Sequence, residues 1–169
     1  YTYPKYEQGL ITYDHKPGQN IEGKMEGAYD YGAQTSVQFP FGYGLSYTTF
    51  SYSNISIDNT SFTADDIIKV SVDVTNTGEV GGKESVLLFS SDLVASLSPD
   101  VRRLRGFEKV SLRPGEVQTV TFDIKGEDLA FVNEKGKWTL EEGEFMLQLG
   151  DQTANIVCTQ TKVWETPNK

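Results

Sequence analysis

The sequence changes character at one aromatic stretch, which reads Phe39-Pro40-Phe41-Gly42-Tyr43-Gly44-Leu45-Ser46-Tyr47-Thr48-Thr49-Phe50. Aromatic side chains supply large apolar surfaces for packing. Gly42 and Gly44 permit backbone angles that side chains forbid, and Pro40 fixes its own φ. A proline and two glycines so close together weaken any strand. We therefore predict a non-repetitive junction from Phe39 to Tyr47, with its rings at a domain boundary.

The chain after this junction has the alternating pattern of β-strands that bury one face. All nine tyrosines lie at or before Tyr52, whereas alternating aliphatic residues dominate the chain beyond that position. Val86 to Phe89 is apolar on both faces and predicts a central strand, and we expect the N-terminal segment to cover its second face. The alternating residues that we expect to point inward between two sheets are Ile68, Val70, Val72, Val74, Val120, Phe122, Ile124, Phe145, Leu147 and Leu149.

The first strand of this part contains a break in the pattern. Phe50 and Tyr52 share one face, whereas Ile55 and Ile57 share a face that is out of phase with it. A bulge near Ser53-Asn54 would reconcile the two halves, because one extra residue shifts the alternation by one position.

The whole pattern indicates an all-β fold of about seven antiparallel strands. Residues Leu104 to Leu112 predict a short strand, Pro114-Gly115 a turn, and Ile156 to Trp164 a closing strand of uncertain register. No apolar period of 3.6 residues extends over ten residues, which argues against helices. The pattern alone leaves a β-barrel and a β-sandwich both open.

Composition excludes several classes of function. The chain has 15 basic and 24 acidic residues, a net charge of −9, so we expect no binding to nucleic acid and none to an anionic membrane. No apolar run approaches the roughly 18 residues of a membrane span. One cysteine, Cys158, and one histidine, His15, are too few for a zinc cluster. We expect no metal and no cofactor.

Residues 1 to 38 cannot build a core of their own. They contain four large aliphatic residues, Leu10, Ile11, Ile21 and Val37, among many tyrosines, glycines and charged side chains. The segment is either a flexible tail or an extended arm whose tyrosines press against a surface. We favour the arm, because disordered tails are usually poor in aromatic residues.

Several ordered motifs resemble those of one known family. The stretch Phe39 to Thr48 resembles the opening signature of the C-terminal fibronectin type III-like domain of family 3 glycoside hydrolases, the β-glucosidase and β-xylosidase group. Val72-Asp73-Val74-Thr75-Asn76-Thr77-Gly78 resembles the second strand and turn of that domain. Leu104 to Leu112 with Arg113-Pro114-Gly115-Glu116 resembles its middle hairpin. Trp138 with Glu142-Gly143-Glu144-Phe145 resembles its last hairpin.

This resemblance implies a fold and a division of the chain. Residues 39–169 would form an immunoglobulin-like, fibronectin III-like β-sandwich of about seven strands. Residues 1–38 would be the extended arm that links it to a catalytic part. In this family the catalytic nucleophile lies in an N-terminal barrel, so no catalytic residue can be transferred to this sequence. The site residues that we assign are those of the domain-junction motif, Phe39, Pro40, Phe41, Gly42, Tyr43, Gly44, Leu45, Ser46 and Tyr47.

The resemblance implies a non-catalytic accessory domain that braces the catalytic domains of a β-glycosidase. Its partners would be those domains, with contact to polysaccharide and assembly with a second copy as further options. It also implies a secreted or periplasmic protein. Because the sequence opens with Tyr1 and not with Met, we expect either a fragment of a longer polypeptide or a processed form.

Two other functions remain open from the sequence. The chain could be a carbohydrate-binding module that tethers an enzyme to polysaccharide, with Trp138, Trp164 and the arm tyrosines stacking on sugars, although core packing is the favoured explanation for Trp138. It could also be a free-standing adhesion module. Adjacent carboxylates such as Asp65-Asp66, Glu127-Asp128 and Glu141-Glu142 are expected to be surface charge rather than a glycosidase pair. A triad through His15 lacks a Gly-x-Ser-x-Gly motif, and Arg102, Arg103 and Arg105 are expected to form surface ion pairs.

Overall fold

The computed structural model of the chain describes residues 41–97 and 100–165. The chain divides into two units, Tyr1–Leu45 and Ser46–Lys169. In the first unit, the arm of residues 1 to 38, with Phe39 and Pro40, lies outside the described residues, so its predicted extended form stays a prediction. The described residues 41–45 contain a turn and no strand, and Gly42 takes a positive φ of 86° there.

The second unit is built from seven longer strands, as the alternation predicts. They are β1 (Phe50–Ile57), β3 (Ile67–Asn76), β4 (Gly82–Asp92), β5 (Arg103–Leu112), β6 (Val117–Lys125), β9 (Gly143–Leu149) and β10 (Gln152–Cys158). Short pieces complete it: β2 (Ser61–Phe62), the 3₁₀ turn η2 (Gly126–Leu129), β7 (Phe131–Val132), β8 (Trp138–Leu140) and β11 (Lys162–Val163).

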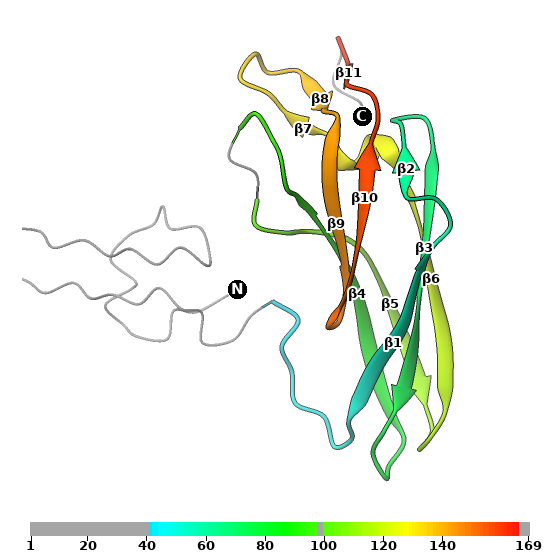
Figure 1. Cartoon of the computed structure of the whole chain (residues 1–169). Coiled ribbons are helices and arrows are strands. Elements are labelled where there is room, and N and C mark those ends of the chain that lie inside the picture. Colours follow the sequence, from blue (N-terminus) through cyan, green and yellow to red (C-terminus); the bar gives the residue numbers. More distant parts are fainter. Residues whose placement is uncertain (1–40, 98–99, 166–169) are drawn as a thin grey trace, which may run out of the picture. The chain divides into compact units, whose positions relative to one another are not determined.

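The long strands form two facing layers, which settles the choice between barrel and sandwich. One sheet has the order β1-β3-β6 and the other β2-β10-β9-β4-β5, while β11-β8-β7 form a small third sheet at one end (Figure 1). All neighbouring strands are antiparallel except β10 and β2, which pair in parallel. The expectation of antiparallel pairing therefore holds for the long strands, and β4 is interior as predicted.

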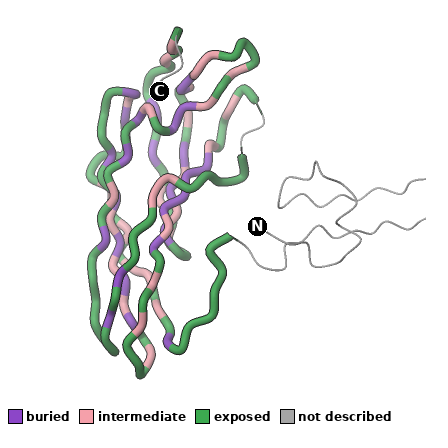
Figure 2. The backbone as a smooth tube through the Cα atoms, turned by 180° about the vertical axis from the view of Figure 1, so that it is seen from behind, coloured by how far each residue is buried: buried purple, intermediate pink, exposed green. Residues whose placement is uncertain are grey.

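The core lies between the two layers. Figure 2 shows the buried positions alternating along the long strands. Nine of the ten residues predicted to point inward are buried, and Phe122 is half-buried and packs against the others. Phe62 from β2 closes the core by packing edge-on against Phe145, with ring centroids 5.7 Å apart.

The predicted bulge in β1 is present. The pairing of β1 with β3 shifts register between Ser53 and Ser56. Asn54 takes a φ of 56°, the one positive value among the described residues other than glycine. Asparagine tolerates this conformation better than most residues, and its side-chain amide donates a 2.9 Å hydrogen bond to Asp73.

Two strands differ from the sequence-based expectation. The short strand expected at Leu104 to Leu112 is a ten-residue strand, β5, which pairs with β4 along nearly its whole length. The closing segment is not continuous, because β10 ends at Cys158 and β11 begins at Lys162. These bounds depend on the partner strands, which local alternation does not reveal.

Candidate functional site

The described part of the junction motif is exposed and non-repetitive. Residues 41–47, the part of the predicted junction that the structure describes, contain no strand, as predicted. Phe41 and Tyr43 are each 55% exposed, Leu45 is 91% exposed, and Tyr47 is fully exposed. Exposed apolar side chains that lie together often mark an interaction surface. The role of these residues at a domain boundary stays a prediction.

The chain is anchored to the sandwich immediately after Tyr47. Thr48 is buried, and its hydroxyl donates a 2.6 Å hydrogen bond to the side-chain oxygen of Asn76. The Thr77 amide donates to the Thr49 carbonyl at 2.8 Å, and the two threonine hydroxyls lie 2.8 Å apart. The entering segment is therefore bonded through both backbone and side chains to the end of β3.

Asn76 is the centre of this anchor. It is completely buried, and its amide group donates to the carbonyls of Val80 at 2.9 Å and Leu112 at 3.0 Å. Its side-chain oxygen accepts from Thr48 and from the Gly78 amide at 3.0 Å. Both donors and both acceptor sites of the side chain are thus used. One residue ties together the entering segment, the turn after β3 and the end of β5.

Two glycines allow the entering segment to lie close to the turn after β3 and the start of β4. A Cβ added at Gly78 would stand 2.2 Å from the Thr48 hydroxyl oxygen, and one added at Gly82 would stand 2.5 Å from the Thr48 methyl carbon. We name Thr48, Thr49, Asn76, Thr77 and Gly78 the linker anchor. Sequence reasoning treated Asn76-Thr77-Gly78 only as a turn, because nothing local distinguishes a turn asparagine from one that binds a distant segment.

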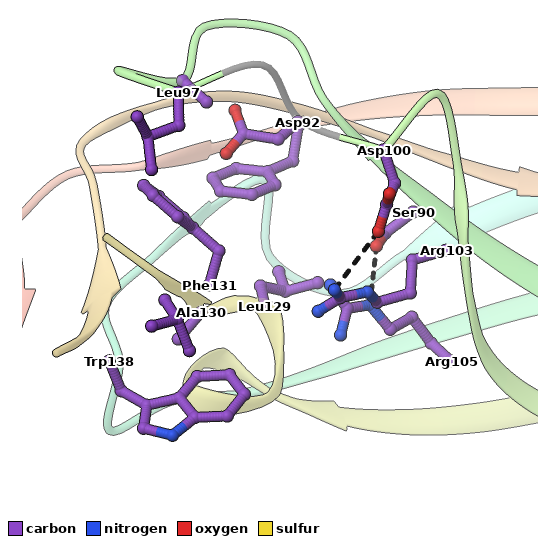
Figure 3. A pocket seen from close by; sticks show the side chains of 13 residues that line it. Ser90, Asp92, Leu97, Asp100, Arg103, Arg105, Leu129, Ala130, Phe131 and Trp138 are labelled. Carbon is purple, nitrogen blue, oxygen red and sulfur yellow. Dashed lines mark hydrogen bonds and ion pairs between the residues drawn. The ribbon is translucent and has the colours of Figure 1, made fainter. Parts of the chain in front are cut away.

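A cleft lies at the end of the sandwich where β4, β5, β7 and β8 meet. Its volume is about 300 Å³. Figure 3 shows the guanidinium groups of Arg103 and Arg105 side by side on one wall, with Phe131, Ala130 and Trp138 on the other. The residues that line the cleft come from five strands (β4, β5, β7, β8 and β9), from η2 and from the segment between β4 and β5, so the cleft exists only in the folded chain.

A bulge in β5 places Arg105 in this cleft. Leu88 pairs with Gly106, whereas Phe89 pairs with Leu104, which leaves Arg105 as the extra residue. Its Nε donates to the Ser90 hydroxyl at 2.7 Å and a terminal nitrogen donates to the Asp128 carbonyl. Burial, with a smaller contribution from the nearby Arg103 charge, lowers the pKa of Arg105 to about 10.

The neighbouring charged groups in the cleft are also oriented. Arg103 forms an ion pair with Asp100, with 3.2 Å between Nη2 and Oδ2. Burial raises the pKa of the Asp92 carboxyl, and a hydrogen bond from the Val94 amide opposes that rise. Arg102 does not join them, since its guanidinium lies 4.6 Å from the centre of the Phe89 ring. Of the three arginines that we expected to form surface ion pairs, Arg103 does so, whereas Arg105 is hydrogen-bonded to Ser90 and Asp128 and Arg102 lies over the Phe89 ring.

A second hollow of about 220 Å³ shares a wall with this cleft. It is lined by Arg103, Arg105, Ala130 and Trp138, which also line the first, and by Glu127, Asp128 and Trp164. Both tryptophans are half-buried and pack in part against the core. We call the two hollows together the Arg–Trp cleft.

The other candidate groups are dispersed over the described residues. Asp65, Glu141 and Glu142 lie in turns or loops, whereas Glu127 and Asp128 belong to η2 and line the second hollow. No group of three or more potential metal-ligating side chains occurs within residues 41–97 and 100–165. Cys158 is buried, and its thiol contacts the Gln160 carbonyl at 3.3 Å. His15 and the arm tyrosines lie outside the described residues. No helix in the described part is long and apolar enough to cross a membrane.

Known proteins that resemble the chain are glycosidases. Residues 84–153 match the Fibronectin type III-like domain family. Thermostable β-glucosidase B of Acetivibrio thermocellus is 44% identical over 73% of this chain and 16% of its own length. The periplasmic β-glucosidase of Salmonella typhimurium is 42% identical over 70% of this chain and 15% of its own length.

Solved structures agree with the sequence relatives. A β-glucosidase of Listeria innocua, a D270A mutant in complex with laminaribiose, matches 94% of this chain with a TM-score of 0.77 and 25% identity, over 23% of its own length. The chain thus spans less than a quarter of each of these proteins. Its seven-stranded sandwich and these matches show that it belongs to the fibronectin type III-like domains of family 3 β-glucosidases and β-xylosidases.

Proposed function

We propose that this chain is a non-catalytic domain that braces the catalytic domains of a secreted or periplasmic family 3 β-glycosidase. The observation that carries the proposal is the linker anchor, directly preceded by exposed apolar side chains. Leu45 and Tyr47 are almost entirely in water, although Thr48 is buried and bonded to Asn76. A fixed exit point beside an exposed apolar segment suits a domain that holds a neighbour in position.

The same proposal assigns no hydrolysis to this chain alone. A glycosidase needs two carboxyl groups flanking a substrate cleft, roughly 5 to 9.5 Å apart. The carboxylates of the Arg–Trp cleft include Asp100, which is in an ion pair with Arg103. We expect the purified chain to release no aryl-β-glucoside or aryl-β-xyloside product above the blank. Turnover that disappears in an Asp92→Asn variant would contradict this part of the proposal.

The bracing role can be tested in a chimera. The chain would replace the matching segment of the Acetivibrio thermocellus β-glucosidase, to which it is 44% identical. We expect Leu45→Ser and Tyr47→Ser to lower the melting temperature of the chimera by several degrees, because apolar contacts with the neighbouring domain are lost. The same changes should leave the melting temperature of the chain alone unaffected, since both side chains are exposed there.

The matched control is Phe107→Ser, which removes another exposed aromatic residue on β5. We expect this control to leave the chimera unchanged. If Phe107→Ser destabilises the chimera while Leu45→Ser and Tyr47→Ser do not, the bracing surface lies on β5 and the junction assignment is wrong.

A further inference from the structure

The Arg–Trp cleft combines an aromatic surface with charged groups that are already oriented. The aromatic part follows from the register of the small third sheet. Val132 pairs with Trp138, and the Trp164 amide donates to the Trp138 carbonyl at 2.9 Å. Directly opposed residues on antiparallel strands project from the same face and lie about 5 Å apart at Cβ. Val132 of β7, Trp138 of β8 and Trp164, which directly follows β11, therefore form a row.

Part of each tryptophan in this row is exposed to the cleft. Both tryptophans line the hollows, and the remainder of each ring packs against the core. Among the described residues, neither indole N–H has a hydrogen-bond partner. An indole ring held in this way offers an apolar face together with one donor at its edge. The C–H faces of a pyranose ring match such a surface, and its hydroxyls can accept from the indole.

The two arginine side chains beside the row are already oriented by hydrogen bonds and an ion pair in the free protein. Arg105 is bonded to Ser90 and to the Asp128 carbonyl, which uses two of the five N–H donors of a guanidinium. Arg103 is oriented by its ion pair with Asp100. Orienting donors in the free protein lowers the entropy that a ligand must lose on binding.

The charges of the cleft indicate which ligands suit it. The residues that line the cleft include two arginines and four carboxylates, Asp92, Asp100, Glu127 and Asp128. Lys125 forms an ion pair with Glu127, and the Lys162 ammonium lies 5.4 Å from the centre of the Trp164 ring, so both signs of charge surround the site. An anionic ligand would therefore meet repulsion as well as attraction. A neutral ligand with many hydroxyl groups can use arginine donors and carboxylate acceptors at once, as sugar hydroxyls do.

We propose that the Arg–Trp cleft binds a neutral saccharide, stacked on Trp138 and Trp164 and hydrogen-bonded by Arg103 and Arg105. The inference is independent of the bracing role, because the linker anchor and the cleft share no residue. No covalent step is involved.

The composition of the chain provides a direct experiment. Trp138 and Trp164 are its only two tryptophans, so all indole fluorescence and both indole ¹H–¹⁵N resonances report on the cleft. The 169-residue chain is titrated with cellotetraose, xylotetraose and laminaritetraose. We expect at least one of these probes to shift both indole resonances and change the fluorescence in a saturable manner. The proposal is overturned if none of the three saccharides shifts either indole resonance at about 20 mM, because a dissociation constant above that concentration corresponds to a very small binding free energy.

Variants then locate the binding. Trp164→Ala should weaken binding by about tenfold, the loss typical of one aromatic contact, while Trp138 remains as the reporter. Arg103→Gln should weaken binding several-fold, and because its side chain is half-exposed this variant tests the proposal even if Trp164→Ala does not fold. The matched control is Arg113→Gln, an exposed arginine in a turn distant in sequence, which should bind as the unmodified chain does.

Two results would contradict the proposal after binding has been observed. If Arg113→Gln weakens binding as much as Arg103→Gln does, the loss of affinity comes from the change in net charge and not from a contact in the cleft. If glucuronate or inorganic phosphate shifts the indole resonances at lower concentration than the three neutral probes, the cleft is an anion site and the neutral assignment is wrong.

Discussion

Asn76 shows how much of this domain depends on a single polar side chain. It lies at the end of β3, is fully buried, and binds three separate segments through four hydrogen bonds. Buried polar groups are stabilising only while every partner is present. The linker anchor is therefore also a weak point, because removal of one amide leaves several buried groups without partners.

We predict that Asn76→Ala lowers the free energy of unfolding by about 3 kcal/mol, since buried carbonyls and the Thr48 hydroxyl lose their partners. Urea denaturation followed by tryptophan fluorescence would measure the change. Asn155→Ala is the matched control, because Asn155 is exposed on β10, and it should stay within about 0.5 kcal/mol. Equal changes in the free energy of unfolding for the two substitutions would show that the hydrogen bonds of the anchor do not stabilise the domain.

Asp73 provides a pH-dependent prediction on the exposed side of the same strand. Its carboxylate accepts hydrogen bonds from the Thr119 hydroxyl at 2.6 Å and from the Asn54 amide at 2.9 Å. These bonds, with the Thr119 hydroxyl contributing most, hold the pKa of Asp73 below its ordinary value of 3.8. Because the folded-state pKa is the lower one, the stabilisation is present above pH 3.8 and is lost as the pH falls through the folded-state pKa.

NMR titration of the Asp73 carboxyl should therefore give a midpoint below 3.8 that rises towards this value in Thr119→Ala. Thr121→Ala, which removes an exposed hydroxyl on the same strand without a contact to Asp73, should leave the midpoint unchanged. A midpoint at or above the ordinary value in the unmodified chain would show that the two hydrogen bonds do not form in solution.

At the scale of the element, alternation in the sequence was sufficient to predict the long strands. Val72, in the centre of β3, is flanked by β1 and β6 and has no exposed surface. The bulge in β1 was also predictable, because it reverses the alternation at Asn54. Neither prediction needed knowledge of the partner strands, because a strand that buries one face shows alternating apolar and polar residues in its own sequence.

We predict that Val72→Ala lowers the free energy of unfolding by about 2 kcal/mol, through lost burial and a cavity in the core. Val117→Ala is the same substitution on the neighbouring strand β6, at a position that is 56% exposed, and should change stability by no more than about 0.5 kcal/mol. Chemical denaturation of both variants would measure the difference. Similar losses at the two positions would mean that the register of the sheet is wrong.

The candidate sites were far less predictable than the strands. The row of Val132, Trp138 and Trp164 depends on strands of two and three residues, which are too short to leave a periodic signal. Arg105 reaches Ser90 because β5 contains a bulge opposite Leu88, and nothing in β5 alone indicates it. Both sites arise where segments distant in sequence meet, so only the folded chain reveals them.

At the scale of the whole molecule, the linker anchor determines where a preceding part of the polypeptide would leave the sandwich. Thr48 is bonded to Asn76, the last residue of β3, and Thr49 is bonded to Thr77 in the loop that follows. The close approach requires a glycine at position 78, where a Cβ would stand 2.2 Å from the Thr48 hydroxyl oxygen and 3.0 Å from the Thr49 nitrogen. A substitution there should release the entering segment while leaving both sheets intact.

We predict that Gly78→Ala speeds amide exchange of Thr77 by about tenfold or more, because its hydrogen bond to the Thr49 carbonyl opens. The chimera with the Acetivibrio thermocellus enzyme should also lose several degrees of melting temperature, since the connection between domains is loosened. Gly81→Ala is the control in the same loop, because a Cβ there meets only the Leu112 carbonyl at an ordinary 3.7 Å. If Gly78→Ala releases the Thr77 amide without affecting the chimera, the anchor fixes the linker but does not brace the neighbouring domain.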